Sequence, residues 1–353
     1  MIHVLCTKTL AQVLSEKLPA CEEEVALLDK WCLSFKEISS KMVILAMCTD
    51  IRFGFALWGV KKEQLRNLTG LVEEGIRNSL RFYGVAEDVI EGYLSGGLSF
   101  SLGTNRSDVS RLNRLARDLT EFSRDNTITE QFSTDIVRSI NNIPRESAIN
   151  SEGFFYPRDR MIELLGERFQ KKAVCQKAYR LTATLDLERS MAVRTIIIPA
   201  EYSFKKLHYA LQNAYNWMNA HLYEFDLGAE TISCDEDEFS EEEVVLAGDV
   251  SLSSRLKAGD SFWYLYDFGD NWEVMIHVDE LLTDYDKPYP VCTRCEGTAP
   301  PEDVGGVWGF QDFMEAFEDP SHPDHEEMVD WVGAYWSPIP EMKVINGKLR
   351  FYI

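Results

Sequence analysis

The longest uninterrupted apolar segments of this chain are short. Met42–Met47 and Phe53–Val60 have the length of β-strands, well below the roughly 20 apolar residues of a membrane-spanning helix. The residues between them, Thr49-Asp50-Ile51-Arg52, have the polarity and length of a hairpin turn. The sequence therefore predicts antiparallel strands, and it excludes a membrane span.

Helical and strand-like patterns alternate in both halves of the chain. The clearest amphipathic helices are predicted at Lys62–Tyr83 and Arg158–Phe169. Strand pairs are predicted in the second half at Tyr179–Glu188 with Val193–Pro199, and at Ser261–Asp267 with Trp272–Asp279. We expect an α+β fold in which antiparallel strands pack against helices.

The chain is long enough for two such domains. Its 353 residues correspond to about two domains of ordinary size. The polar segment 125–157 and the helix that follows it place the boundary after Gln170. We therefore expect an N-terminal domain over residues 1–170 and a C-terminal domain over residues 171–353, each of the α+β class.

Composition supports a folded protein of the cytoplasm. Eight Trp, 14 Tyr and 19 Phe residues provide more surface for burial than a disordered chain carries. The first residues, from Met1 to Lys8, have neither the basic segment nor the long apolar stretch of a signal peptide. We therefore expect a cytoplasmic location and reduced thiols.

The negative charge is concentrated in the second half. Residues 1–170 hold 21 basic and 24 acidic side chains, a net charge of −3, whereas residues 171–353 hold 15 and 34, a net charge of −19. Seven of the nine residues of Asp235–Glu243 are acidic; this segment is either a solvated loop or a tether for a basic partner. A field of this sign repels phosphate backbones, so we expect no direct nucleic-acid binding by the C-terminal domain.

A small basic stripe is predicted in the first half. Arg111, Arg114 and Arg117 fall near one face of a helix over Arg106–Arg124. Such a stripe contacts phosphates in some proteins and is a solvated, ion-paired surface in others. We prefer the second interpretation, because the whole segment Arg106–Arg124 contains five arginines, fewer than a nucleic-acid footprint usually contains.

Three motifs in the second half carry a family resemblance. The segments are Trp217–Phe225, Tyr266–Glu273 and Pro300–Gly309, and in this order and spacing they resemble the plasmid pRiA4b ORF-3-like family. The resemblance spans roughly Ala178 to Trp336. It implies an α+β domain of bacteria, plasmids and mobile elements, where members occur beside transposases, and it implies no particular reaction.

Some positions depart from that family's pattern. Members commonly have Trp-Arg-Arg at Val193-Arg194-Thr195, His at Val274 and Cys at Ala299. If any of these residues is catalytic in relatives, the departure argues against the same reaction here. The first half resembles a second uncharacterised bacterial domain, at Cys6-Thr7-Lys8, Thr104–Ser107 and Tyr156-Pro157.

Acidic, histidine and aromatic residues of the three motifs form the candidate functional cluster. Its members are His221, Glu224, Asp267, Asp270, Trp272, Glu273, Glu302 and Asp303. Carboxylates and imidazoles at such positions bind divalent cations, but Asp270-Asn271 is also ordinary turn chemistry. Alternation along the predicted strand turns Asp267 inward, so it needs a donor, for which Arg194, His221 and backbone N–H groups are the candidates.

A zinc site is a separate alternative. Cys292 and Cys295, with His322 and His325, supply two thiols and two imidazoles, a set that zinc accepts. The histidine spacing is shorter than usual, and Asp324 with Glu327 also fits a capping box that opens a helix. No cofactor is therefore firmly predicted, and zinc or another divalent cation stays an alternative.

Two functions remain open at this level, and we favour the first, which is not enzymatic. The first is a non-enzymatic interaction module whose acidic C-terminal domain binds a basic protein, such as a transposase or another DNA-handling protein. The second is a metal-dependent hydrolase or nuclease that uses the candidate cluster. Mutual distances among His221, Asp267, Glu273 and Glu302 discriminate between them, because only a metal site needs the side chains to converge.

Overall fold

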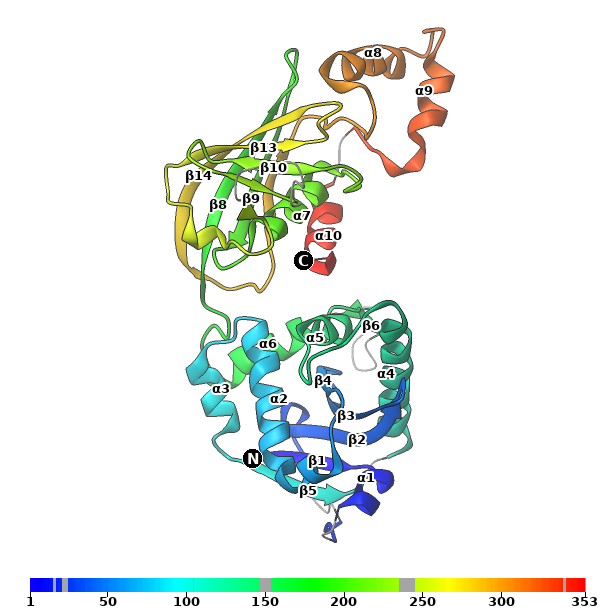
Figure 1. The fold of residues 1–353 in the computed structure, drawn as a ribbon, viewed down its shortest axis with the longest axis vertical. Helices are drawn as coiled ribbons and strands as arrows, with labels where there is room; N and C mark the ends of the chain where they lie inside the picture. Colours follow the sequence, from blue (N-terminus) through cyan, green and yellow to red (C-terminus); the bar gives the residue numbers. More distant parts are fainter. Residues whose placement is uncertain are drawn as a thin grey trace. The chain divides into compact units, whose positions relative to one another are not determined.

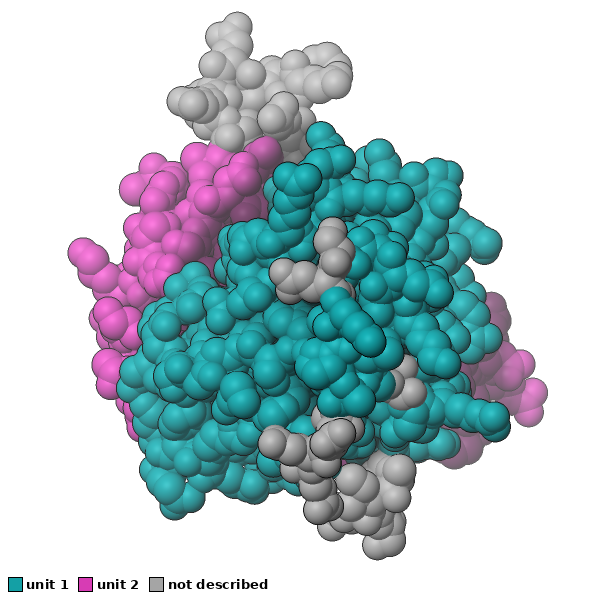
Figure 2. Space-filling view, turned by 90° about the horizontal axis from the view of Figure 1, so that it is seen from below, with its two compact units in different colours: residues 1–175 teal, residues 176–353 magenta. Residues whose placement is uncertain are grey.

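The computed structural model describes residues 1–14, 17–20, 25–103, 105–146, 154–234, 245–338 and 341–352. It divides into two compact units, Met1–Cys175 and Gln176–Ile353, which Figure 2 shows in teal and magenta. The boundary lies beyond the expected position after Gln170, because Ala173 and Val174 are buried in the core of the first unit. The acidic segment Asp235–Glu243 lies outside the described residues.

Unit 1 contains a five-stranded sheet with the strand order β4-β3-β2-β1-β5. Its elements are β1 (Ile2–Cys6), α1 (Lys8–Val13), β2 (Lys30–Ile38), β3 (Lys41–Cys48), β4 (Gly54–Leu57), α2 (Leu68–Phe82), α3 (Glu87–Leu94), β5 (Leu98–Leu102), α4 (Arg106–Asp125), α5 (Thr134–Asn141), β6 (Arg145–Glu146), β7 (Phe154–Phe155) and α6 (Pro157–Phe169). The hairpins β2–β3 and β3–β4 are antiparallel, while β1 pairs in parallel with both β2 and β5. The sheet is therefore mixed, with the predicted hairpin at one side.

Both faces of this sheet are covered by helices (Figure 1). Alternate residues of β3 enter different cores: Ile44 and Ala46 pack with α2, whereas Val43 and Leu45 pack with α4 and α5. Because every strand side chain has an apolar neighbour, the central strands are near-continuous apolar runs rather than alternating ones.

Unit 2 contains an eight-stranded sheet with the order β12-β11-β10-β13-β14-β8-β9-β15. Its elements are β8 (Gln176–Asp186), β9 (Met191–Pro199), α7 (Phe204–Tyr215), β10 (Tyr223–Asp226), β11 (Thr231–Ser233), β12 (Val245–Leu246), β13 (Ser261–Tyr266), β14 (Trp272–Tyr285), β15 (Val291–Glu296), α8 (Gly306–Glu318), α9 (His325–Val332) and α10 (Met342–Tyr352). Within the described segments, no helix combines the length and the apolar character that crossing a bilayer requires.

The core of unit 2 forms around α7 (Figure 1). Ser203 caps this helix by accepting a hydrogen bond from the Lys206 N–H, and the buried stripe of α7 packs against the aromatic inner face of the sheet. Phe225, Tyr264 and Trp272 belong to that inner face. The α+β class expected from the sequence is confirmed in both units.

Candidate functional site

Three separate connections of unit 2 meet at one point of its surface. His221 lies just before β10, Asp267 begins the turn from β13 to β14, and Glu302 and Asp303 lie in the loop that leads to α8. We call these four residues the His–carboxylate cluster. Because β10 begins at Tyr223, His221 lies in the loop that precedes this strand.

The four side chains are centred on the imidazole of His221. Its Nε2 lies 3.1 Å from Asp303 Oδ1, 3.5 Å from Asp267 Oδ2 and 3.9 Å from Glu302 Oε2. One ligand atom from each of His221, Asp267 and Glu302 lies within 4.8 Å of the other two, and this is the one such group that the described residues form. With metal–ligand distances of about 2.0–2.2 Å, neighbouring ligand atoms around one ion lie roughly 3 Å apart, close to this spacing.

Glu302 is the buried anchor of the cluster. Its side chain is 3% exposed, and its Oε1 accepts hydrogen bonds from the Met218 N–H at 2.6 Å and from the Tyr266 hydroxyl at 2.7 Å. Its Oε2 is buried and, within the described residues, has no hydrogen-bond partner; the same holds for His221 Nε2. Buried polar atoms without hydrogen bonds lower the stability of the fold unless another group, such as a bound ion, interacts with them.

Asp267 is arranged in the same way. Its Oδ1 accepts hydrogen bonds from the backbone N–H groups of Gly269 and Asp270, while its Oδ2 faces His221. Of the predicted donors, His221 and the backbone therefore surround this carboxylate. Arg194 is buried elsewhere and donates to the carbonyl groups of Ala214 and Glu296.

The backbone places these carboxylates in unusual conformations. Asp267 has φ 55° and Asp303 has φ 58°, both in the left-handed region, which Asp tolerates better than most residues. Because β13 ends at Tyr266, Asp267 is turned out of the strand toward His221. The strand predicted over Ser261–Asp267 was one residue too long for this reason.

Electrostatics in the cluster favour a cation. Burial raises the pKa of Glu302, and the neighbouring charge of Asp303 acts in the same direction, whereas the hydrogen bonds from Met218 and Tyr266 and the charge of His221 oppose it. Three carboxyl groups around one imidazole leave an excess of negative charge. A divalent ion at this position would neutralise that charge and would give Glu302 Oε2 a partner.

The side chains of the other four predicted members do not join the His–carboxylate cluster. Glu224 and Glu273 flank Leu265 on the outer face of the sheet, opposite the core. Asp270 accepts a hydrogen bond from the Gly305 N–H through Oδ2 at 3.1 Å. Trp272 is fully buried in the core, so its contribution is packing.

The structure does not bring the predicted zinc ligands together. Cys292 and Cys295 lie on β15, and burial raises the pKa of the Cys292 thiol to about 11. His325 Nδ1 instead lies 3.0 Å from the Ala316 carbonyl oxygen, and His322 Nδ1 lies 3.2 Å from the Asp324 backbone nitrogen. The capping-box alternative also fails, because the Asp324 side chain makes no capping hydrogen bond to α9.

The basic stripe is divided between two surfaces of α4. Arg111 and Arg114 line a pocket, whereas Arg117 lies in a neighbouring depression with Arg106. Each step of three residues turns a helix by about 300°, so Arg117 has rotated well away from Arg111. The prediction of one shared face was therefore wrong for Arg117.

Two residues that orient the cluster were not identified from the sequence. Tyr266 donates to Glu302, and its own hydroxyl accepts from the Ala220 N–H at 3.1 Å. The backbone of Met218 supplies the second hydrogen bond to Glu302. Tyr266 precedes Asp267 within the second motif, and this adjacency was the available signal.

Comparisons with known proteins divide the chain as the structure does. The family described as plasmid pRiA4b ORF-3-like protein matches residues 177–341, and a domain of unknown function, DUF6933, matches residues 3–160. Over 157 residues the chain is 38% identical to the uncharacterized protein y4hQ of Sinorhizobium fredii, which covers 44% of this chain and 80% of that protein. It is also similar to the crystal structure of MM3350, a protein of unknown function from Methanosarcina mazei Go1, with 30% identity, a TM-score of 0.42, and coverage of 47% of this chain and 95% of that one.

Proposed function

Residues 177–341 belong to the plasmid pRiA4b ORF-3-like protein family, and from the geometry of their His–carboxylate cluster we propose that unit 2 is a metal-dependent hydrolase. The observation that carries the proposal is the buried Oε2 of Glu302, which accepts no hydrogen bond from any described residue and lies 3.9 Å from His221 Nε2, a second buried atom without a hydrogen bond that has the carboxylates of Asp267 and Asp303 beside it. One imidazole with two or three carboxylates suits Mn²⁺ or Zn²⁺.

The arrangement is that of a catalytic rather than a structural metal site. His221, Asp267 and Glu302 offer three ligand atoms, while the third carboxylate of the cluster, on Asp303, is 68% exposed. Sites with three protein ligands and an open position can hold a water molecule. A divalent ion held by His221, Asp267 and Glu302 would lower the pKa of such a water and so supply a nucleophile for hydrolysis of an ester, amide or phosphoester bond.

The surroundings of the cluster favour a small substrate with an apolar or aromatic group. Met218, Leu222, Phe268 and Trp308 are all more than half exposed. The first three belong to the same connections as His221 and Asp267, and Trp308 lies in the first turn of α8, shortly after Glu302. The strong negative charge of this unit disfavours a nucleic acid. We therefore place ester or phosphoester bonds of small aromatic or apolar compounds first among substrates.

Metal content is the direct test. The purified chain, loaded with Mn²⁺ or Zn²⁺ and dialysed, should retain about one ion per chain by elemental analysis. Glu302→Gln and Asp267→Asn should weaken metal binding by more than about ten-fold, and Glu273→Gln, which removes a carboxylate from the outer face of the same sheet, should leave it unchanged. Equal retention by all variants, or no retention by the wild type, would refute the metal site.

Activity is tested separately with chromogenic substrates. The metal-loaded protein should hydrolyse p-nitrophenyl butyrate or bis(p-nitrophenyl) phosphate, and Glu302→Gln should abolish the reaction while Glu273→Gln does not. A protein that binds one ion and hydrolyses none of these compounds argues against the hydrolase while leaving the metal site intact.

A second function is supported by the exposed apolar side chains themselves. Phe268 and Trp308 are 52% and 69% exposed on an acidic unit, a combination that also suits docking of a basic protein, such as a transposase or another DNA-handling protein. In that case, Phe268→Ser and Trp308→Ser should weaken salt-sensitive binding to the basic partner, whereas Glu302→Gln should not.

A further inference from the structure

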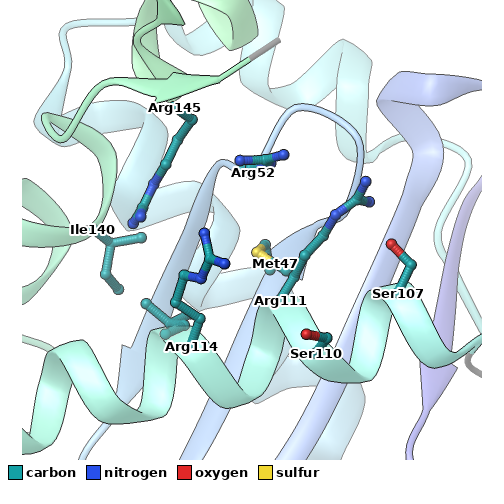
Figure 3. A pocket seen from close by; sticks show the side chains of 9 residues that line it. Met47, Arg52, Ser107, Ser110, Arg111, Arg114, Ile140 and Arg145 are labelled. Atoms are coloured by element: carbon teal, nitrogen blue, oxygen red, sulfur yellow. The ribbon is translucent and has the colours of Figure 1, made fainter. Parts of the chain in front are cut away.

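A pocket in unit 1 gathers four arginines. It is lined by residues of β3, the β3–β4 turn, α4, α5 and β6: Met47, Arg52, Ser107, Ser110, Arg111, Arg114, Leu115, Ile140 and Arg145. Its volume is about 270 Å³. Figure 3 shows Arg114 rising from α4 and Arg145 reaching down toward Ile140, with Arg52 beyond them. The described lining contains no acidic residue.

The fold brings these arginines together from distant parts of the sequence. Ser107, Ser110, Arg111 and Arg114 follow one face of α4 at helical spacing. Arg52 comes from the β3–β4 turn, where it has φ 60°, a conformation that a bulky residue seldom adopts.

The ion pairs near the pocket leave part of this charge unmatched. Arg111 donates to the Thr49 carbonyl group and to the carboxylates of Asp50 and Asp108, and Arg145 lies 3.5 Å from Asp118. Asp108 is shared with Lys30, 3.4 Å away.

The guanidinium groups of Arg52 and Arg114 make no hydrogen bond or ion pair with any residue that the structure describes, although the backbone N–H of Arg52 donates to the Cys48 carbonyl group. Burial and the charges of Arg111, Arg145 and Arg114 lower the pKa of Arg52, and only Glu146 opposes them. Like charges crowded in this way repel one another unless an anion lies between them.

We propose that this pocket binds the phosphate group of a small phosphorylated molecule. Guanidinium groups match phosphate oxygens in pairs of parallel hydrogen bonds, and the hydroxyls of Ser107 and Ser110 add neutral donors. Met47, Leu115 and Ile140 provide an apolar wall for the organic part. The volume of about 270 Å³ is near the lower end of small-molecule sites, about 300–1,000 Å³, so a sugar phosphate or nucleoside monophosphate fits better than a dinucleotide.

This inference is independent of the metal site, since it concerns the other unit. It also revises the preferred interpretation of the basic stripe. A solvated, ion-paired helix surface accounts for Arg111 but not for Arg52 and Arg114, which reach the same cavity from different elements.

Calorimetric titration of the full chain tests the proposal. The probes are inorganic phosphate, ribose 5-phosphate, uncharged ribose and a ten-nucleotide single-stranded DNA, in about 150 mM salt. We expect saturable binding of one phosphate or ribose 5-phosphate per chain and none of ribose. Arg52→Gln and Arg114→Gln should weaken this binding about ten-fold or more, and Arg117→Gln, on the same helix but outside the pocket, should leave it unchanged.

Three results of the titration with these probes would overturn the proposal, and a fourth concerns the Arg114→Gln variant. These are no saturable binding of either phosphate probe, an equal loss in Arg117→Gln, and binding of the oligonucleotide alone, which would indicate a nucleic-acid surface. Thermal unfolding of each variant provides the folding control, since a folded Arg114→Gln protein that still binds phosphate with wild-type affinity also contradicts the proposal.

Discussion

At the scale of single residues, His208 illustrates how the fold of unit 2 sets protonation. Its ring is buried in α7, where Nδ1 lies 2.8 Å from the Tyr264 hydroxyl and Nε2 is bonded to the Asn219 carbonyl oxygen. Tyr264 also accepts a hydrogen bond from Gln212. One assignment satisfies all of these groups: a neutral imidazole that donates from Nε2 and accepts at Nδ1.

Burial lowers the pKa of His208 from 6.5 to about 4, which predicts a pH-dependent stability. Above pH 6.5 the ring is neutral in both states; between pH 6.5 and 4 only the unfolded chain binds the proton, so stability is lost as the pH falls through this range. The contribution is roughly 3 kcal/mol. Chemical denaturation at pH 7 and pH 4.5 should show a smaller loss for His208→Gln than for the wild type; equal losses would show that His208 does not titrate in this way.

Arg194 is a second residue whose role is structural. It is completely buried and donates to the carbonyl groups of Ala214, Glu296 and Val193. Arg194→Leu leaves those carbonyl groups without partners, so we expect the free energy of unfolding to fall by roughly 3 kcal/mol or more. Arg189→Leu, which removes an arginine that is 67% exposed and paired with Glu315, should change it by less than about 1 kcal/mol. Similar effects in urea denaturation would contradict this account.

The sequence identified the residue types of the candidate site better than their arrangement. All four members of the His–carboxylate cluster are among the eight residues selected from three motifs, yet no spacing in the chain indicates that His221, Asp267 and Glu302 meet. Their convergence depends on the pairing of β10 with β13 and on the hydrogen bond between Asp267 N and Leu222 O. These are contacts between distant segments, which local patterns do not encode.

At the scale of elements, the close packing of α2 on β4 depends on a glycine. A Cβ atom at Gly75 would lie 2.1 Å from the ring of Phe55, which is itself fully buried. Gly347, on α10, has no neighbour within 4 Å of that position. Replacement of glycine by alanine should therefore have opposite effects on stability at these two positions.

Gly75→Ala should lower the free energy of unfolding of unit 1 by roughly 1–3 kcal/mol, because overpacking outweighs the better helix propensity of alanine. Gly347→Ala should raise that of unit 2 by up to about 0.8 kcal/mol. Thermal unfolding measures both changes, and a stabilised Gly75→Ala protein would show that Phe55 moves freely.

Some strands and helices were not predicted because their sequences lack a clear local pattern. β2 is buried on both faces, so Trp31, Cys32 and Leu33 are consecutive core residues without the alternation that marks a half-exposed strand. β15, which pairs with β9, was not predicted because the segment around it is rich in Pro, Cys and Gly, residues typical of a loop. α5 was likewise not predicted, because it lies within the polar segment 125–157. The predicted hairpin of β3 and β4 was correct because its turn residues are local signals.

At the scale of the whole molecule, the two structural units differ more in net charge than the two domains expected from the sequence. Residues 1–175 contain 23 basic and 24 acidic side chains, a net charge of −1, and residues 176–353 contain 13 and 34, a net charge of −21. Each unit has its own core. One chain therefore joins a nearly neutral unit with an arginine pocket to a strongly acidic unit with a cluster suited to cations.

This division predicts that the units fold separately and respond differently to salt. Fragments 1–175 and 176–353 should each unfold cooperatively by circular dichroism. Raising NaCl from about 50 to 500 mM should raise the melting temperature of fragment 176–353 by screening its self-repulsion, and should barely affect fragment 1–175. An unfolded fragment 176–353, or an equal salt effect on both fragments, would contradict the prediction.

The parallel pairing of β1 in unit 1 has a consequence for biosynthesis. Ile2 pairs with Leu98 and His3 with Lys30, so β1 has no neighbour on its β5 side until the ribosome has synthesised residues up to Leu102. At about 5–20 residues per second, the nascent chain carries an apolar strand with an open edge for roughly 5–20 s. Translation speed and chaperone access during that interval thus become determinants of the yield of native protein.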